Sequence, residues 1–222
     1  MADINGILGK MRAAGKFQDM KGKGDAGEEA VLQICYDRLQ AKGRGMLYQS
    51  FMYPYQTNRA GVCYTGNVMY ENDIFVDYSS DSINDEIDVL YCTPYRIFPI
   101  EVKSYHSRKL YVYDHWFNKD STIVQKSPIA QAEKHARHLY HAIHSVLPDG
   151  DTEYIIPLVC FVDRCTVIDE RTPEMQEYVP VCILNNLRSV INKHDKPLSY
   201  DIDLPALTDK LNKIKVSIKR TM

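Results

Sequence analysis

The feature that most constrains the fold is an almost continuously apolar run of strand length in the second half of the chain. It reads EYIIPLVCFVD and occupies residues 153–163, and a second such run, VPVCIL, follows at residues 179–184. Strands that are apolar on both faces must be covered on both faces, which sheets obtain from flanking helices. The sequence therefore predicts an α/β fold.

Two segments have the residue spacing of helices that pack on such a sheet. GDAGEEAVLQICYDRLQAKG, residues 24–43, has acids in its first turn, apolar residues at helical spacing and Gly43 after its end. SPIAQAEKHARHLYHAIHSVL, residues 127–147, has Ser127 as an N-cap candidate and Pro128 at the first helical position. We expect one helix over each segment.

Strand signals fill much of the chain between these helices. Residues 46–84 are rich in Tyr, Val and Phe with Gly and Asn between them, which predicts short strands or hairpins. Further strands are predicted at 86–91, 96–105 and 109–114. The resulting order predicts a mixed β-sheet flanked by helices, forming one domain over residues 24–222. Before it, residues 1–23 are expected to form a mobile basic arm.

The composition indicates the class of protein but not its activity. Of the 222 residues, 45% are hydrophobic and 25% are charged, which fits a globular protein. The formal net charge of -2 neither supports nor excludes nucleic-acid binding. No signal peptide and no apolar run of about 20 residues is present, so we expect a cytoplasmic protein that does not enter membranes. A homo-oligomer is compatible with the sequence.

The six cysteines include no Cys-x-x-Cys pair and lie among apolar or aromatic residues. We interpret them as reduced, mostly buried thiols of an intracellular protein. Cys160 and Cys165 could be zinc ligands by number alone, but no second closely spaced Cys or His pair follows them. Packing is therefore the stronger interpretation.

One predicted strand breaks the apolar pattern. In FPIEVKSY, residues 98–105, Glu101 and Lys103 share one face of the strand because successive side chains alternate. A solvated strand edge would explain such a pair. However, Asp88 lies in the preceding strand, where alternation places it on the face opposite Ile87 and Val89. Neighbouring strands are only about 4.8 Å apart. Two carboxylates on one face could therefore approach a single cation.

The pattern Asp88-x12-Glu101-Val-Lys103 resembles the active-site core of the PD-(D/E)XK nuclease superfamily, with Ile87 in place of the proline. The order of further motifs is similar to that of the nuclease-related domain, NERD. These motifs are GDAGE with Glu28, the strand with Asp88, IEVK, and SPIAQ with Gln131. The resemblance covers about residues 24–190 and implies a restriction-endonuclease-like core. Residues 46–84 are longer than is usual there, so we interpret this stretch as a β-rich insertion.

The resemblance implies a metal-dependent nuclease site. Asp88 and Glu101 are hard oxygen ligands of the type that Mg²⁺ prefers, and Mn²⁺ is expected to substitute. The Val102 carbonyl could supply another oxygen, and Glu28 could bind the metal directly, through water, or at a second metal position. Lys103 would orient or deprotonate the attacking water and offset charge on the phosphate.

Gln131 is expected to hold Lys103 or a backbone phosphate. Taken alone, each of these polar residues has a simpler explanation, such as a helix terminus, a turn or a solvated face. Their order and spacing together are what favour the nuclease site.

The helix that carries Gln131 has further polar residues that could contact nucleic acid. His135 and His138 share a face with Gln131, and Lys134 and Arg137 lie beside it. A metal site built from the helix histidines is disfavoured, because their spacing of three drifts around the helix. The basic C-terminal stretch, residues 210–220, is either a solvated closing element or a second phosphate-contacting patch.

The function predicted from the sequence is a metal-dependent nuclease acting on DNA, with endonuclease activity favoured and RNA not excluded. One alternative is a non-catalytic nucleic-acid-binding module with a degenerate site. Another is a small-molecule-binding α/β protein, which is weakened because GKGDAG has the spacing of neither a dinucleotide-binding nor a P-loop motif.

Overall fold

The computed structural model describes most of the chain and all of the predicted core. The described residues are 24–57, 63–65, 83–104, 109–113, 116–119, 122–123, 127–162 and 165–215. The predicted basic arm at 1–23, much of the predicted insertion at 46–84 and the C-terminal residues 216–222 lie outside them.

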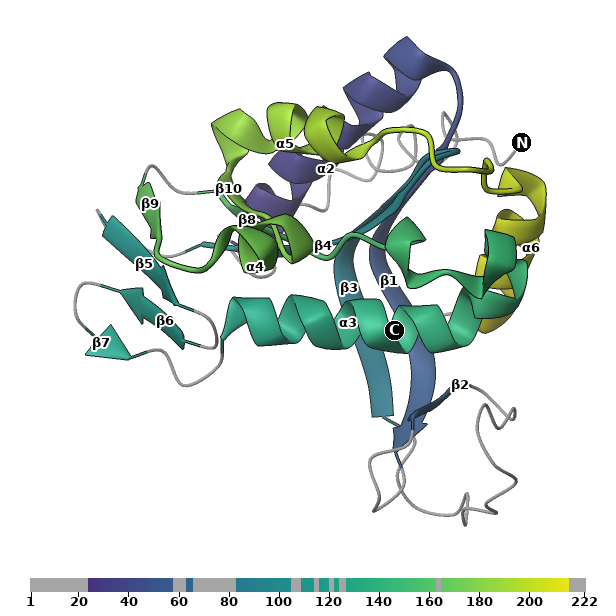
Figure 1. Ribbon diagram of the computed structural model, residues 1–222, viewed down its shortest axis with the longest axis horizontal. Helices are drawn as coiled ribbons and strands as arrows, with labels where there is room; N and C mark the ends of the chain where they lie inside the picture. Colours follow the sequence, from purple (N-terminus) through teal and green to yellow (C-terminus); the bar gives the residue numbers. More distant parts are fainter. Residues whose placement is uncertain are drawn as a thin grey trace, which may run out of the picture.

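The core is a mixed six-stranded sheet, as the sequence predicted (Figure 1). Its strand order is β10-β8-β4-β3-β1-β2. The neighbouring pairs from β2 to β4 are antiparallel, whereas β8 and β10 continue parallel to β4. The strands are β1 (Met46–Thr57), β2 (Cys63–Thr65), β3 (Ile83–Cys92), β4 (Ile97–Lys103), β8 (Leu158–Phe161) and β10 (Val181–Ile183).

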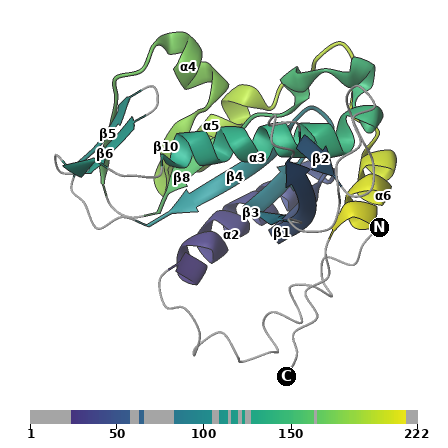
Figure 2. The same cartoon turned by 90° about the horizontal axis from the view of Figure 1, so that it is seen from below.

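Helices cover both faces of this sheet, as Figures 1 and 2 show. On one face, α2 (Gly24–Lys42) and α5 (Leu187–His194) share an apolar cluster with β3, β4, β8 and β10. On the other face, α3 (Pro128–Ile143) and α6 (Leu204–Ile214) share a cluster with β1, β3 and β4. Along the chain, α2 precedes strands β1 to β4 of this sheet, and α3 precedes β8 and β10. This is a mixed sheet flanked by helices, and the predicted fold class is confirmed.

A second, four-stranded sheet was not expected from the sequence. Its order is β7-β6-β5-β9, and it lies at the left of Figure 1, beyond the C-terminal end of β4. Of its strands only β5 was predicted, because the others are too short for a periodic pattern. The strands are β5 (Lys109–Tyr113), β6 (Trp116–Lys119), β7 (Thr122–Ile123) and β9 (Thr166–Asp169), and the short helix α4 (Pro173–Tyr178) leads from β9 to β10.

The two long helices begin and end where the sequence signals them. The Ser127 side chain accepts a hydrogen bond from the Ala130 N–H, and Pro128 occupies the first turn of α3. After α2, Gly43 adopts a φ of 70°, a conformation that glycine reaches without steric cost. Its N–H donates to the Leu39 carbonyl at 2.9 Å and ends the helix.

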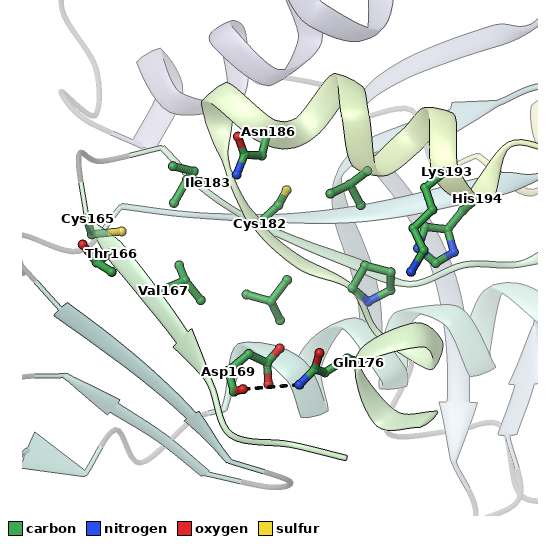
Figure 3. A pocket seen from close by; sticks show the side chains of 13 residues that line it. Cys165, Thr166, Val167, Asp169, Gln176, Cys182, Ile183, Asn186, Lys193 and His194 are labelled. Atoms are coloured by element: carbon green, nitrogen blue, oxygen red, sulfur yellow. Dashed lines mark hydrogen bonds between the residues drawn. The ribbon is translucent and has the colours of Figure 1, made fainter. Parts of the chain in front are cut away.

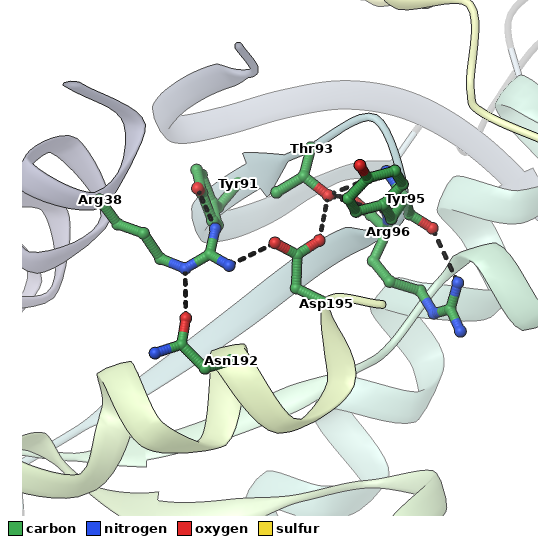
Figure 4. Close-up of polar contacts among 7 residues, drawn as sticks. All are labelled: Arg38, Tyr91, Thr93, Tyr95, Arg96, Asn192 and Asp195. Atoms are coloured by element: carbon green, nitrogen blue, oxygen red, sulfur yellow. Dashed lines mark hydrogen bonds and ion pairs between the residues drawn. The ribbon is translucent and has the colours of Figure 1, made fainter. Parts of the chain in front are cut away.

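A buried polar network joins α2 to the far ends of β3 and α5 (Figure 4). The Arg38 guanidinium donates to the Tyr91 hydroxyl at 2.7 Å and to Asn192 Oδ1 at 3.0 Å, and it forms an ion pair with Asp195. The second Asp195 oxygen accepts from the Thr93 hydroxyl at 2.5 Å. Both charges are buried and both have several partners, which is what makes such a pair tolerable inside a protein.

We expect Asp195→Ala to lower the free energy of unfolding by about 3 kcal/mol or more, because the buried Arg38 charge loses its counter-ion. The matched control is Asp209→Ala, which removes an exposed i,i+4 pair with Lys213 and should cost less than about 0.5 kcal/mol. Urea unfolding of both variants measures the difference. Equal losses would show that the network contributes no more than a surface pair.

Candidate active site

The candidate site lies where β3 and β4 separate. The last pair that joins the two strands is Val89 with Ile100. Two residues further along β4, the Val102 N–H donates to the Asp88 carboxylate at 2.7 Å. A side chain of β3 thus replaces the backbone partner that a continuing ladder would supply. The N–H and C=O of one strand residue point to the same edge, so the Val102 carbonyl also lies on the side of Asp88.

A kink in β1 and β3 accompanies this separation. Ser50 of β1 adopts a φ of 45°, and the pairing of the two strands skips it, since Gln49 pairs with Val89 and Phe51 pairs with Ile87. Ile87 packs in the cluster under α3, whereas Val89 packs in the cluster under α2. We expected Ile87 and Val89 to share a face opposite Asp88. That expectation was wrong, because the kink interrupts the alternation at Asp88.

Glu101 is the most deeply buried carboxylate of the site, with 1% of its surface exposed. It lies on the face of β4 covered by α3. Its Oε1 forms an ion pair with the Lys103 ammonium, so the two charged residues of the IEVK stretch contact each other. The prediction that Glu101 and Lys103 lie on one face of the strand is therefore confirmed.

The second oxygen of Glu101 is incompletely satisfied. His135 Nδ1 of α3 lies 3.2 Å from Oε2, within ion-pair range, yet Oε2 has no hydrogen bond of acceptable geometry. The distance between Nδ1 and Oε2 fits a hydrogen bond, but the angles do not, and a hydrogen bond requires both. A buried carboxylate oxygen without a hydrogen bond is costly unless a proton or a cation compensates it.

The surroundings of Asp88 disfavour its charged form. Burial, followed by repulsion from Glu101, raises the pKa of Asp88 to about 6 from an ordinary value of 3.8. The Val102 N–H and the positive charges of Lys103 and His135 act in the opposite direction. A divalent cation between the carboxylates would relieve this repulsion.

The residues of the site suit Mg²⁺, which keeps several water ligands, better than a metal ion that is bound by protein ligands alone. Among the described residues, no group of three or more His, Cys, Asp or Glu side chains is arranged to hold a metal. Mg²⁺ is commonly bound by one or two carboxylates and keeps several waters. Asp88 and the open oxygen of Glu101 would hold it, with the Val102 carbonyl on the same side.

Glu28 is not part of a three-ligand group with these carboxylates. It is half-buried near the start of α2, which covers the opposite face of the sheet from α3. Metal binding by Glu28, whether directly, through water or at a second metal position, stays a prediction. The neighbouring Gly27 has a clear packing role, since a Cβ there would lie 2.7 Å from Val162 Cγ2.

Gln131 lies half-buried one turn before His135 on α3. We expected its amide to hold Lys103 or a phosphate. Lys103 instead pairs with Glu101. A phosphate contact from Gln131 stays a prediction.

Two of the predicted nucleic-acid-binding residues are not on the surface. His135 and His138 are each 3% exposed, so the expected open face of α3 does not include them. Helical spacing could have indicated this, because each lies three or four residues from an apolar position, Ala132 or Leu139 for His135 and Ala142 for His138. Lys134 is half-buried and Arg137 is exposed, and contact of these two residues with nucleic acid stays a prediction.

A groove of about 510 Å³ lies elsewhere, between β9, β10 and α5 (Figure 3). It contains none of the predicted site residues. Cys165 and Cys182 line it, and Cys160 is buried beneath. All three are free thiols, and the packing interpretation of Cys160 agrees with its burial.

Residues 65–162 match the family model described as nuclease-related domain. The resemblance predicted from the sequence is confirmed. The nuclease-related domain contains Asp88, Glu101, Lys103 and every predicted residue of α3, whereas Glu28 lies before it. The match covers less than half of the chain, and it begins inside the stretch predicted to be an insertion. No curated protein and no solved structure matches the chain.

Within the part of the chain that the structure describes, no helix has the length and apolar character needed to cross a membrane.

The pKa of Asp88 predicts how the stability of the metal-free protein depends on pH. Between 3.8 and about 6 the folded protein keeps a proton on Asp88 that the unfolded chain has lost. The free energy of unfolding therefore falls as the pH rises through this window. At pH values above the window the loss reaches about 3 kcal/mol.

We expect Asp88→Asn to remove this loss while keeping an acceptor for the Val102 N–H. In the presence of EDTA, the variant should be more stable than the parent at pH 8 and should lose most of that advantage at pH 4.5. Urea unfolding across this range measures the effect, and exposed Asp201→Asn is the control. If Asp88→Asn is more stable than the parent by the same amount at every pH, the raised pKa of Asp88 is contradicted.

Proposed function

We propose that the protein is a metal-dependent nuclease that hydrolyses phosphodiester bonds of DNA, with Mg²⁺ as cofactor and endonuclease activity favoured. The observation that carries this proposal is the buried pair Asp88 and Glu101 at the separation of β3 and β4, with Lys103 beside it. The match to the nuclease-related domain supports it.

Each residue has a role that follows from its surroundings. When bound, Mg²⁺ would lower the pKa of a water molecule and offset charge on the phosphate. Asp88 and Glu101 supply two negative charges that would hold the cation, and Lys103 lies beside them. Asp88 also accepts from the Val102 N–H, which fixes the direction of its carboxylate.

Lys103 is the mobile partner of its ion pair. Its side chain is 24% exposed, compared with 1% for Glu101. A cation that draws charge from Glu101 weakens the attraction that holds the ammonium there. Lys103 can then turn toward phosphate or water, where it orients or deprotonates the water and balances developing negative charge.

Nucleic-acid binding is assigned to the exposed side of α3 near the site. Arg137 is exposed and Lys134 is half-buried on this helix. Cationic side chains that contact phosphates give affinity without reading the base sequence. We therefore expect little sequence preference from these two residues.

Lys103→Met is expected to separate catalysis from binding. It keeps most of the aliphatic stem and removes the charge, so single-turnover cleavage of DNA should fall by roughly 100-fold or more. Metal affinity should be unchanged or higher, because a neighbouring positive charge is gone. The exposed Lys42→Met is the charge-matched control and should cleave like the parent. Cleavage by Lys103→Met at the parent's rate would remove Lys103 from the catalytic group.

Glu101→Gln is expected to abolish stabilisation by Mg²⁺. The parent should melt at a higher temperature with Mg²⁺ than with EDTA, since a ligand that binds only the folded state stabilises it. The variant should melt at the same temperature in both. A Mg²⁺-dependent increase that survives in the variant would exclude Glu101 as a ligand. A parent that binds metal but cleaves neither DNA nor RNA would favour the non-catalytic nucleic-acid-binding alternative.

A further inference from the structure

His135 is a buried polar residue to which the proposed chemistry gives no role. Its side chain is 4% exposed and faces a Glu101 side chain that is 1% exposed. Burying an imidazole is unfavourable unless its nitrogens find polar partners. The separation of 3.2 Å between Nδ1 and Glu101 Oε2 identifies the partner of one nitrogen.

The turn of α3 that carries His135 is fixed to the sheet from a second direction. The hydroxyl of Tyr53, a fully buried residue of β1, donates to the His135 carbonyl at 3.3 Å. Small residues flank His135 on the buried side of the helix, where Ala132 and Ala136 allow α3 to approach the sheet closely. The backbone of this turn is therefore held against the sheet by contacts that do not depend on Glu101.

We infer that His135 is a positioning residue, which donates a hydrogen bond from Nδ1 to Glu101 Oε2 and so fixes the direction of that carboxylate. The inference rests on the proposed function, in which Glu101 is a metal ligand. The two atoms are within hydrogen-bond distance, so only the direction of the N–H separates this contact from a hydrogen bond.

The contact leaves Glu101 able to bind a cation. A carboxylate oxygen has two lone-pair positions, so Oε2 can accept from Nδ1–H with one and keep the other open. Lys103 is paired to Oε1. His135 thus restrains the carboxylate from the side of α3, while Lys103 restrains it along β4. Hydrogen bonds of this kind to a ligand commonly change metal affinity by 10- to 100-fold.

Two substitutions distinguish positioning from simple packing. His135→Asn places an N–H donor close to where Nδ1 stands, whereas His135→Leu fills the space without a donor. Calorimetry with Mn²⁺ alone should show affinity about 10- to 100-fold weaker for the Leu variant and close to the parent for the Asn variant. The control is His194→Leu, a buried histidine on α5, which should bind Mn²⁺ like the parent. Equal affinities for the Leu and Asn variants would overturn the inference.

A second measurement needs no metal and no activity. Nitrogen NMR of histidine-labelled protein in EDTA should show the His135 ring protonated at Nδ1, with the signal assigned by its loss in His135→Asn. That signal should shift in Glu101→Gln. A ring protonated only at Nε2 would overturn the inference even if the protein cleaves DNA.

These measurements separate the two proposals. If the parent neither binds Mn²⁺ nor cleaves, the proposed function fails, and the ring's protonation alone decides whether His135 positions Glu101. If both His135 variants bind Mn²⁺ like the parent but bind DNA more weakly in EDTA, His135 acts on nucleic acid, and positioning is overturned.

Discussion

The candidate site depends on the point at which β3 and β4 stop pairing. A strand that leaves its neighbour exposes backbone groups that need new partners. Here the Val102 N–H finds the Asp88 carboxylate, so one hydrogen bond both closes the end of the ladder and aims a charged side chain. The fork also leaves Asp88 and Glu101 on neighbouring strands, where repulsion from Glu101 adds to burial in raising the pKa of Asp88. Backbone geometry, and not side-chain attraction, is what holds two like charges together.

Two buried charge clusters of the described residues, around Arg38 and around Glu101, differ in how completely they are satisfied. Around Arg38 and Asp195, tyrosine, asparagine and threonine complete the hydrogen bonding. At Glu101, one oxygen has no hydrogen bond, although a histidine lies 3.2 Å away. The first arrangement is what stability alone would favour. The arrangement at Glu101 is unfavourable for the chain alone. A bound cation would supply the partner that the second Glu101 oxygen lacks.

Much of the fold and part of the site could be predicted from the sequence, for identifiable reasons. The long helices carry their own start and stop signals at Ser127 and Gly43. The strand alternation in IEVK places Glu101 and Lys103 on one face without reference to the rest of the chain. The kink at Ser50 could not be predicted, because serine has no marked preference for positive φ and the cause is tertiary. The second sheet was missed because strands as short as β7 leave no periodic pattern.

His135 shows why a residue's type can mislead when its position is informative. A histidine beside Lys134 and Arg137 suggests a surface that contacts phosphate, and we predicted that role. Helical spacing from Ala132 and Leu139 instead places it on the buried face, opposite β4. Whatever its neighbours in the sequence, a buried polar residue needs a polar partner, and Glu101 Oε2 lies 3.2 Å from His135 Nδ1. A polar residue on the apolar face of a helix can therefore indicate where the sheet beneath it carries charge.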